Sequence, residues 1–199
     1  MAGGLVAHEE FSRMTFRLGL ANDHDHNQII RLVEEAASWL RNKGTDQWAR
    51  PWPSCSARDA RICADISEGK TWIAWDGDTP AATITSEETA HQPLLSEWDD
   101  GEPAAYVHRL VVARRYGGRG LGSSLLNWAG RRAAQGYGAR WIRIDVWKTN
   151  KTLHKYYVRQ GFTFVRQCRD AEYPSGALSR RQRTRSLTSI AICQPRRLP

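Results

Sequence analysis

The spacing of hydrophobic and polar residues changes several times along the chain, and each spacing predicts one type of element. Apolar residues three or four positions apart are typical of amphipathic helices. A long helix of this kind is predicted between a cap at Asp25 or Asn27 and a stop at Gly44. The other predicted helices cover residues 58–67, 121–135 and 152–160.

Short apolar or alternating runs between these helices predict β-strands. The predicted strands cover residues 15–20, 71–75, 81–85, 106–112, 141–147 and 162–168, and residues 186–192 are a candidate for a last strand. Residues 76–80 include a glycine and a proline, so they favour a hairpin between the second and third strands. The elements follow one another in the order βααβββαβαβ, which predicts an α/β fold.

Length and composition limit the number of domains. A chain of 199 residues, 41% of them hydrophobic, can bury one ordinary α/β core. We expect a flexible leader at residues 1–13, one domain at 14–173 and an arginine-rich segment at 174–199. The sequence contains no run of about 18 apolar residues and no signal-peptide pattern. We therefore expect a cytoplasmic protein without a membrane partner, as a monomer or a homodimer.

The formal net charge of +8 is concentrated near one end of the sequence. The only charged residues at positions 174–199 are six arginines, which are Arg180, Arg181, Arg183, Arg185, Arg196 and Arg197. The other 23 basic and 21 acidic residues nearly cancel. A basic end is typical of a solvated tail, and the same pattern would suit an arm that binds nucleic acid. The charge pattern alone leaves both interpretations open.

A glycine-rich turn between a predicted strand and a predicted helix is the first candidate for chemistry. Glycines occupy positions 117, 118, 120 and 122, at the start of the helix at 121–135. Backbone N–H groups without bulky side chains can surround phosphate oxygens, and the positive end of the helix dipole points to the same place. The spacing fits neither the dinucleotide fingerprint nor the P-loop, and a plain strand-to-helix turn would look similar.

Two motifs suggest a specific family. Residues 115–120, with the pattern Arg-x-x-Gly-x-Gly after an apolar strand, resemble the acyl-CoA signature of the GNAT superfamily of N-acetyltransferases. Downstream, Asn150 lies seven residues before Tyr157, and Tyr157 lies four residues before the Gly-Phe pair at 161–162, which resembles the second motif of the family. The resemblance covers about residues 14–170 and is weakest in the first half, where the acceptor would bind.

The resemblance implies a fold and a donor site. The GNAT fold is a mixed, largely antiparallel sheet flanked by helices, with two splayed central strands that leave a gap for acetyl-CoA or another acyl-CoA. Acyl transfer from CoA to the amine would be direct, through a tetrahedral intermediate. The implied cofactor-binding residues are Leu110, Val111, Val112, Arg115, Tyr116, Gly117, Gly118, Arg119, Gly120, Leu121, Gly122, Ser123 and Asn150.

Three residues are candidates for proton transfer. Tyr157 stands where the family often has its general acid, and a phenol remains protonated at neutral pH; packing in the core is the alternative. The attacking amine must also lose a proton. His108, on the strand before the glycine-rich turn, and Asp145, on the next strand, are candidate bases, although either could be a packed or structural residue.

The acceptor side of the predicted site rests on weaker signals. Aromatic side chains beside a cleft can bind an apolar or cationic acceptor, with ordinary packing as the alternative. The candidates for substrate binding are Gln47, Trp48, Trp52 and Trp98. No metal site is predicted, because the sequence His24-Asp25-His26 begins a helix, where capping residues are expected, and the four cysteines are scattered.

These observations predict an N-acyltransferase that acts from acetyl-CoA on a small-molecule amine, such as a natural product or an antibiotic. Two alternatives remain open. An aminoacyl-tRNA-dependent transferase on the same fold could bind tRNA through the arginine-rich segment. A module that binds acyl-CoA or nucleic acid without catalysis would carry the same motifs.

Overall fold

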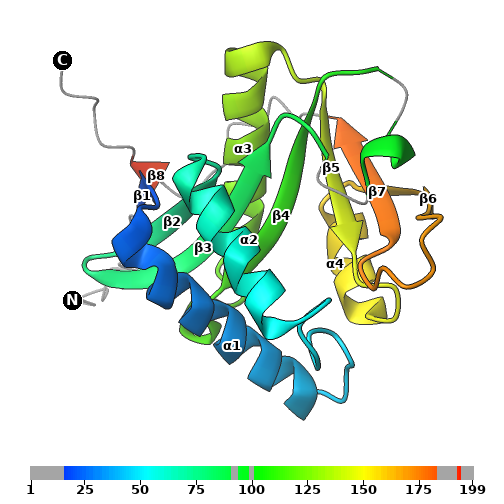
Figure 1. Ribbon diagram of the computed structural model, residues 1–199. Coiled ribbons are helices and arrows are strands. Elements are labelled where there is room, and N and C mark those ends of the chain that lie inside the picture. The colour runs from blue at the N-terminus through cyan, green and yellow to red at the C-terminus, as the bar shows by residue number, and fades with distance from the viewer. Residues whose placement is uncertain (1–15, 91–93, 99–100, 183–191, 194–199) are drawn as a thin grey trace, which may run out of the picture.

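One sheet organises the part of the chain that the structure, a computed structural model, describes, namely residues 16–90, 94–98, 101–182 and 192–193. Its strands are β1 (Phe16–Leu20), β2 (Thr71–Asp76), β3 (Thr79–Glu87), β4 (Ala104–Val112), β5 (Trp141–Val146), β6 (Thr163–Gln167), β7 (Ala177–Gln182) and β8 (Ile192–Cys193). Their spatial order is β6-β7-β5-β4-β3-β2-β1-β8, and all pairs are antiparallel except β4–β5 and β1–β8 (Figure 1).

Helices cover both faces of this sheet (Figure 1). The helices are α1 (His26–Asn42), α2 (Cys55–Ser67), α3 (Leu121–Tyr137) and α4 (Lys151–Arg159), with short 3-10 turns η1 (Asp23–Asp25), η2 (Leu95–Glu97) and η3 (Arg114–Tyr116). Helices α1 and α2 lie over one face, and α3 and α4 lie over the other. The predicted α/β class, a mixed sheet flanked by helices, is confirmed.

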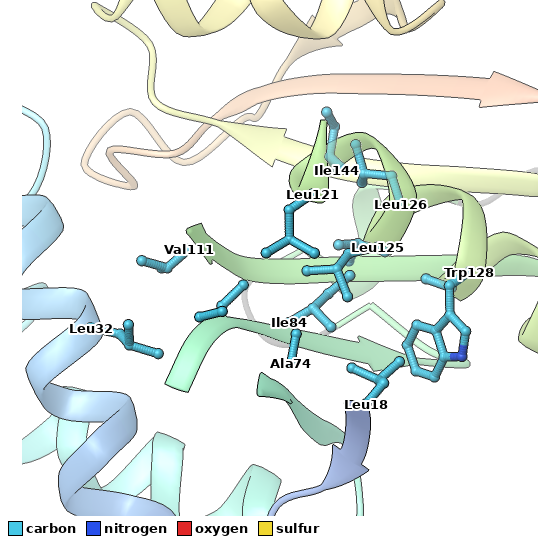
Figure 2. Close-up of a cluster of buried hydrophobic side chains, with 14 of the residues drawn as sticks. Leu18, Leu32, Ala74, Ile84, Val111, Leu121, Leu125, Leu126, Trp128 and Ile144 are labelled. Atoms are coloured by element: carbon cyan, nitrogen blue, oxygen red, sulfur yellow. The ribbon is translucent and has the colours of Figure 1, made fainter. Parts of the chain in front are cut away.

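The main hydrophobic core lies between the central strands and the helices on both faces (Figure 2). Its buried residues include Leu18, Leu32, Ala74, Ile84, Val111, Leu121, Leu125, Leu126, Trp128 and Ile144. Nearly all of β3 is buried, because helices pack on both of its faces. This core fixes β4 and α3 relative to each other, and the candidate site is built on those two elements.

The parallel strands β4 and β5 are paired over only part of their length. Their register runs from Ala104 opposite Trp141 to Val107 opposite Ile144. Beyond Val107, β4 continues beside β3 as far as Val112, while β5 continues beside β7. The two strands therefore separate at the centre of the sheet, which confirms the predicted splay.

The first part of the arginine-rich segment 174–199 forms a strand that the sequence did not predict. Residues 177–182 form β7, which lies inside the sheet between β5 and β6. Arg181 is buried there, and it donates hydrogen bonds to the carbonyl of Gln160 at 2.9 Å and to Asn127 Oδ1 at 2.7 Å. The predicted strand at 186–192 lies outside the described residues except for Ile192, which pairs with β1.

Candidate active site

A cleft of about 580 Å³ opens where β4 and β5 separate. A β-bulge in β4 shapes one wall, because the three residue steps from His108 to Val111 lie opposite only two steps, from Thr85 to Thr83, on β3. Arg109 in this bulge has a positive φ of 43°. As a result the consecutive residues 107–110 all line the cleft, whereas a regular strand would turn every second side chain away.

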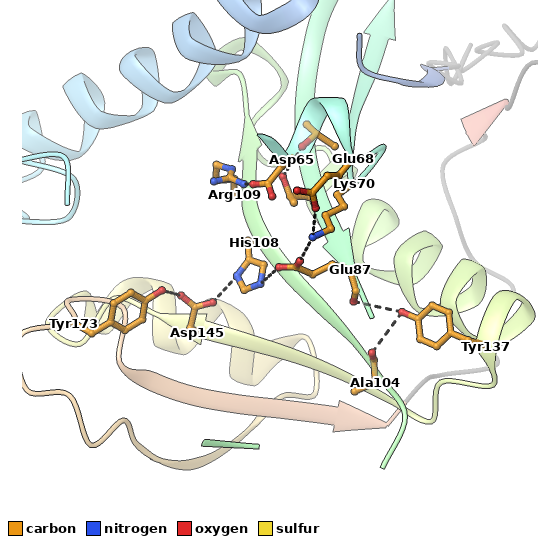
Figure 3. Close-up of polar contacts among 12 residues, drawn as sticks. Asp65, Glu68, Lys70, Glu87, Ala104, His108, Arg109, Tyr137, Asp145 and Tyr173 are labelled. Atoms are coloured by element: carbon orange, nitrogen blue, oxygen red, sulfur yellow. Dashed lines mark hydrogen bonds and ion pairs between the residues drawn. The ribbon is translucent and has the colours of Figure 1, made fainter. Parts of the chain in front are cut away.

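The imidazole of His108 lies between two carboxylates in this cleft (Figure 3). Its Nδ1 is 2.8 Å from Asp145 Oδ1, and its Nε2 is 3.2 Å from Glu87 Oε1. The second oxygens also have donors, because the Tyr173 hydroxyl donates to Asp145 Oδ2 at 2.7 Å and Lys70 Nζ lies 2.8 Å from Glu87 Oε2. These five side chains form a continuous polar chain, which we call the His108 cluster.

The two carboxylates decide the protonation of His108. Burial lowers the pKa of the imidazole, but Asp145 and Glu87 raise it more, so that the pKa is about 9. For the Glu87 carboxyl, burial acts in the opposite direction and raises the pKa, because it disfavours the charged form. Hydrogen bonds from His108 and Lys70 outweigh burial and bring the pKa of Glu87 below its usual value. At neutral pH, His108 is therefore mainly an imidazolium, and a minority of molecules holds the neutral imidazole that can accept a proton.

Tyr157 faces the same cleft from α4. Its ring packs edge-on against Phe162, with 5.4 Å between ring centroids. Burial, with the neighbouring Tyr156 and the charge of Asp145, raises the pKa of the Tyr157 hydroxyl well above its usual value, so it stays protonated at physiological pH. Tyr156 instead approaches α3, where its hydroxyl lies 2.8 Å from the position that a Cβ on Gly122 would take.

The glycine-rich turn presents backbone N–H groups at the start of α3. Gly120 is the N-cap in the left-handed region (φ 78°), and no side chain in the described part of the chain caps this end. Gly118 is also left-handed, with open space where a Cβ would lie. The first N–H groups of a helix lack partners within the helix, and Arg115 and Arg119 add positive charge nearby. A pyrophosphate group fits such a site.

The sequence matches the model of the Acetyltransferase (GNAT) family over residues 31–162, which is more than half of the chain. The chain belongs to the GNAT acetyltransferase family. A curated relative described as an uncharacterized N-acetyltransferase, YesJ of Bacillus subtilis (strain 168), is 32% identical over 148 residues, which are 71% of this chain and 78% of the relative. The chain is thus an N-acetyltransferase of the GNAT type, with acyl-CoA as its cosubstrate.

Solved GNAT structures share the fold. A GNAT family acetyltransferase from Listeria monocytogenes 4b F2365 superposes with a TM-score of 0.67 at 24% identity and covers 84% of this chain and 94% of its own. The PaiA N-acetyltransferase from Thermoplasma acidophilum, solved with coenzyme A, has a TM-score of 0.65 at 15% identity, with 85% and 99% covered. Arabidopsis thaliana Naa50, solved with a bisubstrate analogue, has a TM-score of 0.55 at 19% identity, with 83% and 97% covered.

Asn150, predicted from the GNAT resemblance to bind CoA, and Gln47, predicted to bind the acceptor, are hydrogen-bonded to each other. The side-chain oxygen of Asn150 caps α4 by accepting from the Leu153 N–H at 3.0 Å, and its amide donates to Gln47 Oε1 at 2.6 Å. Both side chains are buried. Within the chain, therefore, Asn150 joins the loop after α1 to the start of α4, and its contact with CoA stays a prediction.

The three tryptophans predicted to bind the acceptor of this GNAT enzyme differ in whether they line the cleft. Trp48 and Trp52 line the cleft. Trp98 is not among the residues that line the cleft, and it packs against the Tyr106 ring at 6.3 Å and against the guanidinium of Arg143 at 4.8 Å. Trp98 and Trp52 both pack on a second hydrophobic cluster on the sheet, and the role of Trp98 in acceptor binding stays a prediction.

Sequence reasoning missed several side chains of the GNAT site. Glu87 follows a predicted strand in a polar segment, and Tyr173 directly precedes the arginine-rich segment, so neither has a motif that would have identified it. Arg109 is also missing from the prediction, although it adjoins His108, because its orientation depends on the bulge. Their placement depends on strand register.

Other expectations concern partners of the GNAT domain. Within the described residues, no group of three or more His, Cys, Asp or Glu side chains is placed to hold a metal ion, and Asp25 instead accepts hydrogen bonds from Asn22. Across those same residues, none of the helices combines the length and the apolar character that crossing a membrane requires. Of the six arginines, Arg180 and Arg181 belong to β7, and the other four lie outside the described residues.

Proposed function

We propose that this chain transfers the acyl group of acetyl-CoA to a small-molecule amine, of the kind found in natural products or antibiotics, inside the cleft between β4 and β5. The observation that carries the proposal is the juxtaposition of Tyr157 and the His108 cluster on the walls of one cleft. Thioester aminolysis needs one group that donates a proton to the leaving thiolate and one that accepts a proton from the amine. Tyr157, whose hydroxyl stays protonated, and His108 can fill these two roles.

The donor side would use the backbone of residues 110–112 and the turn at 115–123. The N–H groups at the start of α3 would bind the pyrophosphate, and Arg115 would contribute charge. Leu110 lines the cleft, so the strand leads from the turn to the His108 cluster. The thioester would then lie between β4 and β5, close to both proton-transfer groups.

Tyr157 would act as the general acid. The amine nitrogen forms a bond to the thioester carbonyl carbon, the carbon–sulfur bond breaks, and the Tyr157 hydroxyl gives its proton to the departing thiolate. The proton lost by the amine would pass to His108 in its neutral form. Proton exchange with water then restores both residues, so that amine and acyl-CoA are converted to amide and CoA.

We assign the base to His108 rather than Asp145 because a neutral imidazole is a stronger proton acceptor than a carboxylate, although both side chains have partners in the cluster. Both oxygens of Asp145 accept hydrogen bonds, one from His108 and one from Tyr173. Asp145 is therefore best described as a positioning residue that orients the imidazole and sets its pKa. Glu87 has the same role on the other side of the ring.

A donor assay with a panel of amines tests the proposal. The protein is mixed with acetyl-CoA and small amines, and release of free CoA thiol is measured together with the mass of the acylated product. We expect small amines to be acylated with a higher turnover than peptides, and without any requirement for aminoacyl-tRNA. Transfer confined to peptide N-termini, or activity that requires charged tRNA, would contradict the small-molecule assignment.

A further inference from the structure

Helix α2 places one guanidinium in the acceptor half of the cleft, next to the loop tryptophans. Arg61 is half-buried and lines the cleft. Its Nη2 donates to the carbonyl oxygen of Trp52 at 2.5 Å, and its guanidinium carbon lies 5.8 Å from the centre of the Trp52 ring. These contacts hold the guanidinium beside Trp52, and a guanidinium has five N–H donors, of which the bond to the Trp52 carbonyl uses one.

A second guanidinium, that of Arg109, lies near the first. Arg109 forms an ion pair with Asp65 of α2 and lines the same cleft. Burial, and then the positive charge of Arg61, lower the pKa of Arg109 to about 10. Its backbone has a positive φ of 43°, which residues other than glycine rarely adopt, and strained residues of this kind cluster at active sites and ligand clamps. The bulge thus holds Arg109 toward the cleft at a cost in strain.

The charges that line the cleft are unevenly matched. The matched carboxylates are Asp65 with Arg109, Glu68 and Glu87 with Lys70, and Asp145 with His108. Arg61, by contrast, pairs with none of the carboxylates in the described part of the chain. A polycationic acceptor would therefore meet carboxylates that already have partners, together with an uncompensated positive charge. An anionic group on the acceptor would be attracted to Arg61.

We propose that Arg61, supported by Arg109, forms a carboxylate subsite, and that the acceptor is an α-amino acid or a close analogue with an apolar side chain. The inference rests on the proposed function, because it names the substrate class of that site. Arg61, Arg109 and His108 line the same cleft, so a carboxylate held by the arginines would leave the α-amine inside the cleft that His108 also lines. Trp48, Trp52 and Ile62, which line it as well, would contact the apolar side chain.

Matched acceptors test the subsite. Apolar amino acids such as phenylalanine and leucine are compared with their carboxamides and with the corresponding amines that lack the carboxyl group. With saturating acetyl-CoA, the carboxylated acceptors should have kcat/KM values at least about 10-fold higher, as expected for a charge-assisted hydrogen bond. Arg61→Gln should raise the KM of the carboxylated acceptors about 10-fold or more and remove this preference. Arg61→Lys should retain part of it, because it keeps the charge but not the planar fork.

The control is Arg58→Gln, one turn earlier in α2. The Arg58 guanidinium already has Asp59 at 2.7 Å and Glu34 at 3.6 Å, so its removal should change the KM of carboxylated acceptors by less than about 2-fold. A similar rise in both variants would show a general change in α2 and overturn the subsite. A rise in the KM of acetyl-CoA alone in Arg61→Gln would assign the arginine to the donor and overturn it as well.

A binding measurement separates this inference from the proposed function. The same compounds are titrated by calorimetry into protein saturated with CoA, which cannot turn over. If no amine is acylated but the carboxylated compounds bind and Arg61→Gln abolishes the binding, the subsite stands and the proposed function fails. If amines are acylated but the carboxylated compounds bind no better than their carboxamides, the proposed function stands and the subsite is wrong.

Discussion

His108 and Asp145 are joined across the opening between two parallel strands, with His108 Nδ1 2.8 Å from Asp145 Oδ1. The pairing of β4 with β5 ends one residue earlier on both strands, at Val107 and Ile144. The first side chains beyond the paired region therefore connect the strands in place of backbone hydrogen bonds. This contact puts an imidazole of raised pKa at the point where the cleft begins.

The pH dependence of the reaction should follow His108. A base acts in its neutral form, and the carboxylates raise the pKa of His108 to about 9, so kcat/KM should increase with pH and level off above about 9. An acceptor whose own amine has a pKa well below 7 is used, so that the titration observed belongs to the enzyme. His108→Gln should remove this limb and lower kcat/KM about 100-fold or more.

Asp145→Asn tests the same pH dependence from the other side of the His108–Asp145 contact. It keeps a side chain of similar size and removes the charge that raises the pKa of His108, so the rising limb should move to lower pH. A limb that stays at about 9 in this variant would mean that another group titrates. A flat profile in the wild type would exclude His108 as the base.

The glycine-rich turn can be tested by one substitution at the start of α3. Gly120→Asp places a negative side chain at a left-handed position beside the N–H groups that would bind a pyrophosphate, so CoA binding should be lost. Gly120→Ala is the neutral control and should retain binding with a smaller loss, because only backbone strain is added. Calorimetry on folded protein measures both. Unchanged affinity in Gly120→Asp would place the donor elsewhere.

Arg181 should contribute to stability rather than to polyanion binding. Its guanidinium is buried and donates to Gln160 and Asn127, so Arg181→Gln should reduce the free energy of unfolding by about 1.5–3 kcal/mol. Arg180, on the same strand as Arg181, packs over the Trp141 ring of β5 at 4.3 Å. Arg180→Gln should reduce the free energy of unfolding by less, about 1 kcal/mol or below. Denaturant titration gives both values. Equal and negligible changes in the free energy of unfolding would mean that both arginines are solvated and contribute nothing to the fold.

The sequence allowed prediction of the elements whose signals are local. The turn at 115–123 and Tyr157 were identifiable because motifs of a few residues specify them, and His108 and Asp145 because they lie on neighbouring predicted strands. Glu87 and Tyr173 were not, since their contacts depend on the register of the sheet and on the path of the chain after β6.

The strand β7 was missed for a different physical reason. Its arginines look solvated in a sequence, because an arginine is rarely buried without partners. The partners of Arg181 are the Gln160 carbonyl at the end of α4, Asn127 in the middle of α3, and the Phe162 ring. Only the assembled fold brings these three groups together. The packing of Trp98 on Arg143 likewise depends on the assembled fold.

The most direct test of the account is the turnover of Tyr157→Phe, measured beside Tyr156→Phe. The first substitution removes only the hydroxyl of a residue that lines the cleft, so CoA affinity should be unchanged while kcat falls roughly 10²- to 10⁴-fold. Tyr156→Phe removes a hydroxyl that faces α3 and should matter much less. Wild-type turnover in Tyr157→Phe with its acceptor would contradict the assignment of this cleft as the site of acyl transfer through a tyrosine acid.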